Sequence, residues 1–462
     1  MIKTRFAPSP TGELHIGGVR SALFVYLFAK SKGGDFLLRI DDTDRERYVE
    51  GSVERIIESL NWLGIVPDNL DNLVVQSERK ELYHKYAKQL LDQGDAYICT
   101  CSKEQLEKDK EEQVANKLPP MYSGRCRESN IRLEDVKEGE YVIRMKMPKG
   151  EIIKFHDLIR GDIEFDSSLI DDQVLIKSDG FPTYHLATVI DDHLMEISHI
   201  IRAEEWLSST PKHLVLFRML GWEAPEIAHL SQVLNKDKKK LSKRDGAASV
   251  IEYKKLGFLP EALRNFIVLL GWHPKDETEV FETMDSIIGA FEFERIQKAG
   301  AVFDMDKLNW FNRHYIANVL SLEELTERAR EFVPSEWSLT QEIMASVRSR
   351  LDKLSDLKEM ISFFFELPEY AADDLYWKET KTAKENLEAV LEKISALPES
   401  GFSKTAIEEI NGIVPSDKKG EWLWPLRVAL SGKRVSPSPF EIIAGLSKEE
   451  TLRRIRLGIE KL

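Results

Sequence analysis

The N-terminal region alternates short apolar runs with segments of helical periodicity. Residues 4–7 and 36–40 have the length and composition of short buried strands. The segment that begins at Gly17 and the segment 53–60 each repeat apolar side chains at helical spacing. The order strand, helix, strand, helix is typical of a fold in which helices cover a parallel sheet. We therefore predict a doubly wound α/β domain.

A change of pattern between about residues 97 and 172 predicts an insertion in this domain. Short β-like runs such as 141–145 are separated there by loops rich in Lys and Glu that also contain Gly and Pro. The α/β pattern then resumes with residues 184–190, a strand candidate at 197–201 and a helix candidate at 211–220. The α/β domain is thus predicted to be split by an α+β insertion.

From Tyr253 onward the strand signals nearly vanish. Amphipathic helical segments such as 322–332 and 343–365 dominate this part of the chain. The chain has 462 residues, which is enough for roughly three folding units of about 150 residues each. We therefore expect all-α C-terminal domains after the α/β domain.

The composition excludes several classes of protein. Apolar residues make up 42% and charged residues 31% of the chain, which indicates a globular protein. No stretch approaches the roughly 18 uninterrupted apolar residues of a membrane-spanning helix, and the first residues lack the pattern of a secretory signal. We expect a cytoplasmic protein with no membrane partner. The net charge of −14 counts only weakly against nucleic-acid binding, because a basic surface can be local.

A glycine-containing loop before a helix candidate has features of a phosphate site. The sequence Pro8-Ser9-Pro10-Thr11-Gly12 leads into His15-Ile16-Gly17-Gly18. A helix N-terminus offers unpaired N–H groups, and glycine lets a phosphate approach the backbone. His15 adds a donor for charge that develops on phosphorus. Taken alone, a Gly-Gly pair before a helix is often only a tight turn, and a single His is more often structural.

A lysine-rich segment follows the second half of the α/β pattern. It extends from Lys236 to Gly246 and contains Lys240-Leu241-Ser242-Lys243-Arg244. Most lysine runs are solvated surface. Only the embedded Lys-Leu-Ser-Lys sequence favours a functional interpretation.

The pairing of the motif at 15–18 with the motif at 240–244 resembles the two signature sequences of class I aminoacyl-tRNA synthetases. Residues 5–12 and 38–44 look like the glutamyl/glutaminyl branch of this family, and the resemblance covers essentially the whole chain. Glutaminyl members typically have His where this chain has Gly18, and they carry β-barrel anticodon domains. The chain is therefore more similar to the bacterial glutamyl members.

The resemblance implies two ATP-dependent transfers at one site. The carboxylate of L-glutamate attacks the α-phosphorus of ATP, which is bound with Mg²⁺, and a ribose hydroxyl of the terminal adenosine of tRNA(Glu) then takes the acyl group. The implied catalytic residues are His15, Lys240 and Lys243. The implied ATP-binding residues are Pro8, His15, Gly17, Gly18 and Lys243.

The same resemblance implies a glutamate pocket. A guanidinium selects a carboxylate over an amide by bidentate pairing, and the family gives this role to Arg5. Asp41 stands where the family usually has Glu for the substrate's amino group, and Thr188 stands where it often has Asn. Without the family, Tyr184 would be interpreted as a core aromatic residue and Arg202 as a surface charge. The implied glutamate-binding residues are Arg5, Ala7, Ser9, Asp41, Tyr184, Thr188 and Arg202.

The three cysteines lie in one short region, and their odd number argues against a disulfide framework. Cys99, Cys101 and Cys126 resemble the zinc knuckle in the inserted domain of some family members, which implies one Zn²⁺ per chain. Tyr122 fits one family variant as the fourth ligand, whereas the position where another variant has His is Arg127 here. The alternative is three ordinary thiols.

The sequence leaves the tRNA partner open. Many bacteria charge both tRNA(Glu) and tRNA(Gln) with one glutamyl enzyme, and Arg350 looks like the arginine of the discriminating form. A surface arginine on a helix is the alternative for Arg350. The terminal arginines 453, 454 and 456 are predicted to lie on a solvated face, and contact with the anticodon arm is the alternative. A non-catalytic tRNA-binding paralogue is the alternative function, and the family is usually monomeric.

The resemblance also implies domain boundaries. A Rossmann-type catalytic domain is predicted at 1–82 and 185–237, with an acceptor-end-binding insertion at 83–184. A stem-contact domain that carries the Lys-Leu-Ser-Lys-Arg loop is predicted at 238–320. A helical anticodon-binding region of two subdomains is predicted at 321–462.

Overall fold

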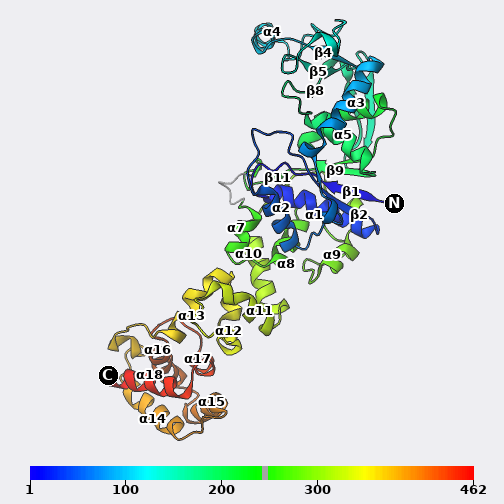
Figure 1. The fold of residues 1–462 in the computed structure, drawn as a ribbon. Coiled ribbons are helices and arrows are strands. Elements are labelled where there is room, and N and C mark those ends of the chain that lie inside the picture. The colour runs from blue at the N-terminus through cyan, green and yellow to red at the C-terminus, as the bar shows by residue number, and fades with distance from the viewer. Residues whose placement is uncertain (242–247) are drawn as a thin grey trace. The chain divides into compact units, whose positions relative to one another are not determined.

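The computed structural model describes residues 1–241 and 248–462, which form two compact units. The first unit consists of Met1–Glu252 and Leu263–Met305, and the second of Tyr253–Ala262 and Asp306–Leu462. Figure 1 shows the elements of each unit. None of the helices in the described part of the chain combines the length and the apolar composition that crossing a membrane requires.

A seven-stranded sheet forms the centre of the first unit, in the order β3-β2-β1-β9-β10-β6-β7. Adjacent strands from β3 to β6 are parallel, and β7 pairs antiparallel with β6. Because β1 lies between β2 and β9, the strand order reverses at β1, and ligands bind at such a switch point, outside the carboxyl ends of the strands. The strands are β1 (Lys3–Phe6), β2 (Asp35–Ile40), β3 (Val74–Val75), β6 (Ile152–Asp157), β7 (Gly161–Asp166), β9 (His199–Ala203) and β10 (Glu226–Leu230).

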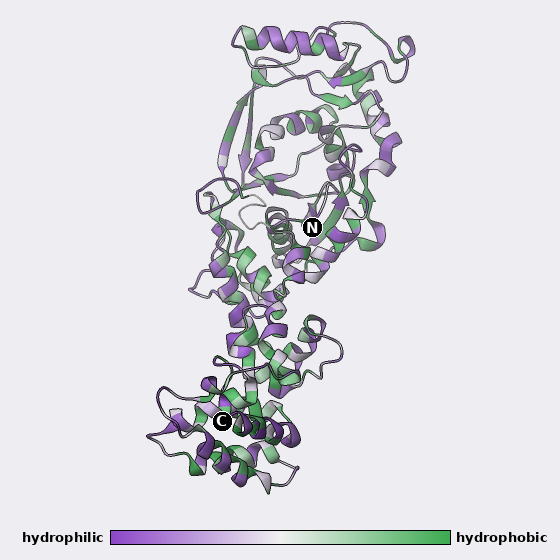
Figure 2. Cartoon of the chain, turned by 90° about the vertical axis from the view of Figure 1, so that its left-hand side faces the viewer, coloured by the Kyte–Doolittle hydropathy of each residue, from purple (hydrophilic) through white to green (hydrophobic). Residues whose placement is uncertain are grey.

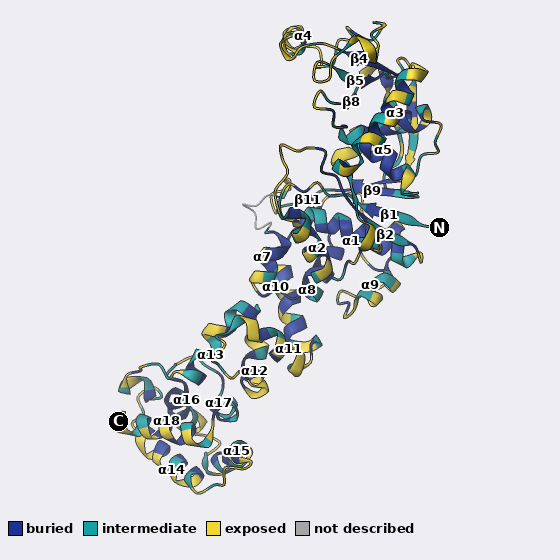
Figure 3. Ribbon diagram, viewed as in Figure 1, coloured by how far each residue is buried: buried dark blue, intermediate teal, exposed yellow. Residues whose placement is uncertain are grey.

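Helix α1 (Ile16–Ser31) packs against β1, β2 and β9. Its side chains are buried around most of the helix (Figure 3), because the sheet covers one side and Phe291 packs on Phe24 from another. The other helices of this part are α2 (Ser52–Trp62), α5 (Tyr184–Leu194) and α6 (Thr210–Met219). Parallel strands connected by helices confirm the predicted doubly wound α/β fold.

A separate antiparallel sheet lies in the predicted insertion. Its strands are β4 (Ala96–Cys99), β5 (Val142–Met145) and β8 (Val174–Ile176), and the helices of this region are α3 (Lys80–Gln93) and α4 (Lys103–Ala115). Leu90 of α3, Ile143 of β5 and Leu186 of α5 belong to one buried cluster. The sheet therefore shares its core with a helix of the α/β domain. Helix α4 is mostly exposed (Figure 3).

Strands β6 and β7 lie within the range 83–184, yet they extend the seven-stranded sheet. Asp157 at the end of β6 pairs with Ile227 of β10, and the Leu158 N–H donates to the Ile227 carbonyl at 2.9 Å. Alternating apolar residues identify a strand but do not say which sheet it joins. The domain boundaries themselves remain a prediction.

The chain between the α/β domain and the helical region contains both helices and short strands. Strands β11 (Val233–Leu234) and β12 (Ala301–Val302) pair in parallel. The helices are α7 (Val250–Lys255), α8 (Pro260–Val268), α9 (Met284–Ala290) and α10 (Met305–His314).

The remainder of the second unit is helical, as predicted. Figure 2 shows these helices with hydrophobic residues interspersed with hydrophilic ones. Among them Leu387, Leu426 and Ile455 are fully buried. The helices are α11 (Leu322–Ala329), α12 (Gln341–Val347), α13 (Leu357–Phe365), α14 (Ala383–Ser395), α15 (Phe402–Ile413), α16 (Lys419–Ser431), α17 (Pro439–Gly445) and α18 (Lys448–Lys461).

Two predictions for this unit are wrong in detail. The segment 343–365 is not one helix, because the chain turns after α12 and Leu351 adopts an extended conformation with its side chain fully buried. The Leu354 N–H then donates to the Gly257 carbonyl at 3.0 Å instead of continuing a helix. Arg454 is not solvated: it is 1% exposed and donates to carbonyls of Phe363 and Leu430, both at 2.6 Å.

Candidate active site

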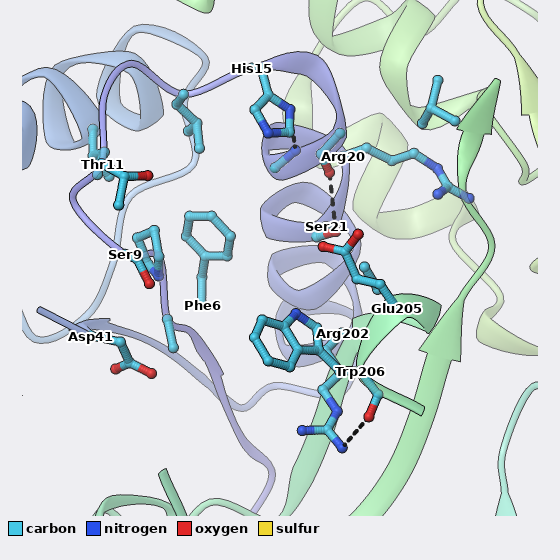
Figure 4. Close-up of a pocket in the computed structure, with 18 of the residues that line it drawn as sticks. Phe6, Ser9, Thr11, His15, Arg20, Ser21, Asp41, Arg202, Glu205 and Trp206 are labelled. Carbon is cyan, nitrogen blue, oxygen red and sulfur yellow. Dashed lines mark hydrogen bonds between the residues drawn. The ribbon is translucent and has the colours of Figure 1, made fainter. Parts of the chain in front are cut away.

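A cavity of about 670 Å³ lies at the carboxyl ends of β1, β2 and β9, beside the N-terminus of α1 (Figure 4). Most of the residues implied by the two motifs and the glutamate pocket line it, although they come from segments far apart in the sequence. They are Arg5, Ala7, Pro8, Ser9, His15, Gly17, Gly18, Asp41, Tyr184, Thr188, Arg202 and Lys240. Lys243 lies outside the described residues.

His15 is the N-cap of α1, and its Nδ1 accepts a hydrogen bond from the Gly18 N–H at 3.4 Å. The first N–H groups of a helix have no partner within the helix and carry its positive dipole end. A Cβ at Gly18 would meet Leu14 Cδ1 at 2.8 Å, so a side chain there would require Leu14 to move. This end of the cavity thus combines an imidazole with a helix terminus, which suits it to phosphate.

Lys240 enters the same cavity from the segment after β11. Its Nζ lies 2.8 Å from Glu205 Oε2, and both side chains are exposed. An exposed pair of this kind is weak and exchanges readily. The ammonium group can therefore leave Glu205 for a phosphate oxygen. The sequence analysis did not single out Glu205. Its contact with Lys240 joins residues far apart in the chain, and no local pattern marks such a pair.

Arg5 reaches the cavity from β1 and is 4% exposed. Its Nε and Nη2 donate to the two carboxylate oxygens of Asp192, at 2.8 and 3.2 Å. Arg39 of β2 donates to the same carboxylate through Nη1 at 2.6 Å. Burial alone would raise the pKa of Asp192, but the two guanidinium groups overcome it and hold this pKa below its usual range. Asp192 is therefore a shared anion between two buried cations.

Asp41 lies immediately after β2, and Arg39 also fixes its position. Arg39 Nε donates to Asp41 Oδ1 at 2.7 Å, and Nη2 donates to Oδ2 at 3.3 Å. Burial raises the pKa of Asp41 to about 6, against the opposing effect of Arg39. The Asp41 N–H donates to the Pro8 carbonyl at 3.1 Å, which connects Asp41 to the loop of residues 8–12.

Thr188 of α5 accepts a hydrogen bond from Arg39 Nη2 at 2.7 Å. Arg39 thus contacts both positions at which this chain departs from the family pattern, Asp41 and Thr188. Arg39 is fully buried and was not singled out from the sequence. Its signal was a charged residue inside an apolar strand, and Asp191 and Asp192 in the apolar helix α5 were a matching signal.

Arg202 lies on β9, the parallel neighbour of β1 that carries Arg5, and is 7% exposed. Its Nη1 donates to the Tyr184 hydroxyl at 3.0 Å. Its Nη2 donates to the Trp206 carbonyl at 3.2 Å, as Figure 4 shows. The rings of Tyr184 and Trp206 pack with centroids 4.4 Å apart. Tyr184 is therefore a wall of the cavity rather than a core residue.

The three cysteines form a cluster in the insertion, where their Sγ atoms all lie within 4.8 Å of one another. Cys101 and Cys126 Sγ are 3.5 Å apart, and the Tyr122 hydroxyl lies 3.3 Å from Cys99 Sγ and 3.6 Å from Cys101 Sγ. A tetrahedral zinc with bonds of about 2.3 Å separates its sulfur ligands by about 3.8 Å. The donor set and its spacing fit a zinc ion.

Arg350 lies in the second unit, between α12 and α13. Its side chain is half exposed and its Nη2 is 3.9 Å from Glu441 Oε2. Such a contact leaves the guanidinium accessible to a ligand.

Comparison with known proteins agrees with this arrangement. The family model of class I tRNA synthetases (E and Q), catalytic domain, matches residues 1–310, and the anticodon binding domain model matches residues 324–459. The fold and the site define a class I synthetase of this type. The chain belongs to the glutamate and glutamine branch of the class I tRNA synthetases.

Individual relatives cover the whole chain. The glutamate–tRNA ligase of Finegoldia magna is 42% identical over 100% of this chain and 99% of its own length. That of Dehalococcoides mccartyi is 43% identical, with coverage of 100% and 98%. The crystal structure of a glutamate tRNA ligase from Elizabethkingia meningosepticum in complex with its amino acid is 36% identical, with a TM-score of 0.88 and coverage of 100% and 99%.

Proposed function

We propose that this chain uses ATP to attach L-glutamate to tRNA(Glu). The observation that carries this proposal is a single cavity that joins the N-terminus of α1 to a floor of arginine and aspartate side chains. The full-length relatives named as glutamate–tRNA ligases support the same activity.

The reaction consists of two transfers. An oxygen of the glutamate α-carboxylate bonds to the α-phosphorus of ATP, and the bond from that phosphorus to pyrophosphate breaks. A ribose hydroxyl of the terminal adenosine then attacks the glutamyl carbonyl carbon, loses its proton, and AMP leaves. No covalent bond to the enzyme is needed, so the protein contributes position and charge stabilisation.

The phosphate end of the cavity acts in the first transfer. Pro8, Gly17 and Gly18 bring the backbone close to the triphosphate, and the helix N-terminus stabilises its charge. His15 donates to a phosphate oxygen as the negative charge grows. Lys240 and Lys243 neutralise the departing pyrophosphate. Mg²⁺, which ATP brings, offsets part of the triphosphate charge.

The other end of the cavity selects the amino acid. Arg5 takes the side-chain carboxylate, for which an amide is a poor substitute because it cannot form the charge-assisted pair. Asp41, with Ser9 and the Ala7 backbone, takes the ammonium group. Tyr184, Thr188 and Arg202 complete the pocket. Arg202 adds a second positive charge to that of Arg5.

Zinc binding is a further part of the proposal. Cys99, Cys101 and Cys126 supply three thiolates, and the Tyr122 hydroxyl completes a tetrahedron. A closed set of four protein ligands is structural, so zinc would order the loops of the insertion rather than act in the chemistry.

The tRNA side of the proposal concerns the whole chain. The insertion at 83–184 receives the acceptor end, the region 238–320 contacts the stem, and the helical region 321–462 reads the anticodon. The protein acts as a monomer. Arg350 favours tRNA(Glu), and charging of tRNA(Gln) is the relaxed alternative.

ATP–pyrophosphate exchange with tRNA(Glu) present tests the proposed chemistry. Label should pass from pyrophosphate to ATP with L-glutamate and not with L-glutamine at the same concentration. Binding of tRNA(Glu) without any exchange would support a non-catalytic tRNA-binding protein instead.

A further inference from the structure

Arg202 is held from every side by neutral groups. A guanidinium has five N–H donors, and all five of Arg202 have an acceptor. Nε donates to His229 Nε2 at 3.1 Å, and the two Nη atoms bond to His213 Nδ1 at 3.3 Å and Thr210 Oγ1 at 2.9 Å. The remaining two donors meet the Tyr184 hydroxyl and the Trp206 carbonyl.

Arg202 therefore differs from the other buried arginines of the site. Arg5 and Arg39 share the carboxylate of Asp192, and Arg39 also pairs with Asp41. Within residues 1–241 and 248–462, no carboxylate lies close enough to Arg202 to form an ion pair with it. Its positive charge is thus fixed in place but not neutralised, and a buried charge of this kind attracts an anion strongly.

The hydrogen bonds assign the state of both imidazoles. His229 Nε2 accepts from Arg202, so its proton sits on Nδ1 and is donated to Asp157 Oδ2 at 2.6 Å. His213 Nδ1 also accepts from Arg202, so its Nε2 proton is donated to His185 Nδ1 at 3.0 Å. Burial and the neighbouring Arg202 lower the pKa of His213 well below its ordinary value. Burial likewise lowers the pKa of His229, although Asp157 opposes it.

Asp157 shows why a histidine stands between it and Arg202. Its carboxylate is fully buried and accepts from the Ile159 and Arg160 N–H groups at 3.0 and 2.8 Å. A direct contact between Asp157 and Arg202 would form a closed ion pair. The imidazole of His229 instead bonds to both groups, to Arg202 through Nε2 and to Asp157 through Nδ1. It therefore separates the carboxylate of Asp157 from the guanidinium of Arg202.

We propose that His213 and His229 are positioning residues that hold Arg202 through uncharged acceptors, so that its charge stays available for a carboxylate of the amino-acid substrate. This inference rests on the proposed function. It adds two residues to the pocket that do not touch the substrate themselves.

The two donors on the cavity side indicate where that carboxylate binds. The bonds to the Tyr184 hydroxyl and the Trp206 carbonyl are partly exposed, whereas those to His213, His229 and Thr210 are buried. Tyr184, Trp206 and Arg202 all line the cavity. A carboxylate that takes the place of these two acceptors therefore reaches one N–H of each Nη atom, and the three buried bonds keep the guanidinium plane fixed.

A pair of variants that differ only in charge tests the proposal. His213→Gln keeps a neutral acceptor for Arg202, and His213→Glu places a carboxylate of the same size beside it. We expect His213→Glu to raise the KM for L-glutamate roughly tenfold or more relative to His213→Gln, because the new carboxylate pairs with Arg202. The KM for ATP should agree between the two variants.

The matched control is His193, another imidazole of the α/β domain, which stacks on Trp222 and has no contact with Arg202. His193→Gln and His193→Glu should have equal KM values for L-glutamate. If the His213 pair fails to fold, Thr210→Asn and Thr210→Asp make the same comparison at the opposite edge of the guanidinium.

The outcomes separate this inference from the proposed function. A wild-type chain that does not charge tRNA(Glu) rejects the proposed function. If the wild-type chain charges tRNA(Glu) but the Gln and Glu variants of His213 have equal KM values for L-glutamate, the inference alone is overturned. A histidine with a purely structural role would give equal KM values for the two variants.

Discussion

Arg5 and Arg202 enter the cavity from the parallel strands β1 and β9, but their charges are compensated differently. Asp192 is bonded to Arg5 through two contacts, whereas Arg202 is surrounded by neutral acceptors. The site thus offers two arginines, one paired with a carboxylate and one held by neutral groups. Two positive charges suit a substrate with two carboxylates and one ammonium group, such as L-glutamate. Asp41 is the anion that we propose for the ammonium group, and burial raises its pKa to about 6.

Replacing Arg5 by alanine should remove glutamate selection and spare ATP. We expect the KM for L-glutamate to rise on the order of a hundredfold, because losing one partner of a buried charge pair costs roughly 3 kcal/mol. Asp192 keeps its bond to Arg39, so the pocket does not gain an unpaired anion. Steady-state charging kinetics measure both KM values. Lys3→Ala on the same strand, whose Nζ pairs with an exposed Glu196, is the control. An unchanged glutamate KM in Arg5→Ala would remove Arg5 from the pocket.

The raised pKa of Asp41 predicts a pH dependence. An acid with a pKa of about 6 is ionised above pH 6, and only the ionised form binds an ammonium group. The kcat/KM for L-glutamate should therefore fall as pH decreases through 6, approaching about tenfold per pH unit. The profile between pH 5 and pH 8 checks this, with Asp41→Asn as the comparison. A wild-type profile that stays flat across that range would contradict the role of Asp41.

At the scale of elements, periodicity predicted the strands and helices that build the sheet. Residues 36–40 and the helix after Gly17 appear as β2 and α1. They were predictable because the spacing of their apolar side chains along the sequence matches the way these side chains pack. The segment 343–365 was predicted as helical throughout, and tertiary contacts of Leu351 and Leu354 interrupt it. Local spacing cannot anticipate a contact made far along the chain.

The polar part of the site was predicted only where a motif marked it. His15 and Arg5 stand in recognisable sequences, whereas His213 and His229 lie in an ordinary helix and an ordinary strand. What joins them is a set of hydrogen bonds to Arg202 that exists only in the folded chain. A charged residue within an apolar strand, Arg39, was a signal for the neighbouring network of Asp41, Thr188 and Asp192, to which His213 and His229 do not belong.

The loops that carry the cysteines should depend on zinc. Purified wild-type protein is expected to hold one zinc per chain, and Cys126→Ser should lose most of it because one thiolate is missing. Tyr122→Phe should weaken binding if the hydroxyl is the fourth ligand, whereas Ser123→Ala should not. Elemental analysis of each protein gives the answer. Less than about a tenth of an equivalent in the wild type, prepared without chelator, would leave the cysteines as ordinary thiols.

At the scale of the whole molecule, two family models of different function cover successive parts of the chain. The catalytic model matches residues 1–310, and the anticodon model matches 324–459. With a net charge of −14, any basic surface of the chain is local. We therefore expect recognition of tRNA to depend on a local basic surface rather than on the overall charge.

Arg350 is the position at which tRNA discrimination can be tested. We expect Arg350→Gln to raise charging of tRNA(Gln) relative to tRNA(Glu), because the change removes the accessible guanidinium that we propose reads the anticodon. The ratio of kcat/KM for the two tRNAs measures this effect. Arg330→Gln, an exposed arginine of the same unit that pairs with Glu327, is the control. A ratio that is equal in wild type and Arg350→Gln would remove Arg350 from anticodon recognition.

Charging of purified tRNA with radiolabelled amino acid tests the central claim most directly. With ATP and Mg²⁺ present, labelled glutamate should become acid-precipitable on tRNA(Glu), and labelled glutamine should not. Additional labelling of tRNA(Gln) with glutamate would identify the relaxed form of the same enzyme. Absence of glutamate from both tRNAs would contradict the account.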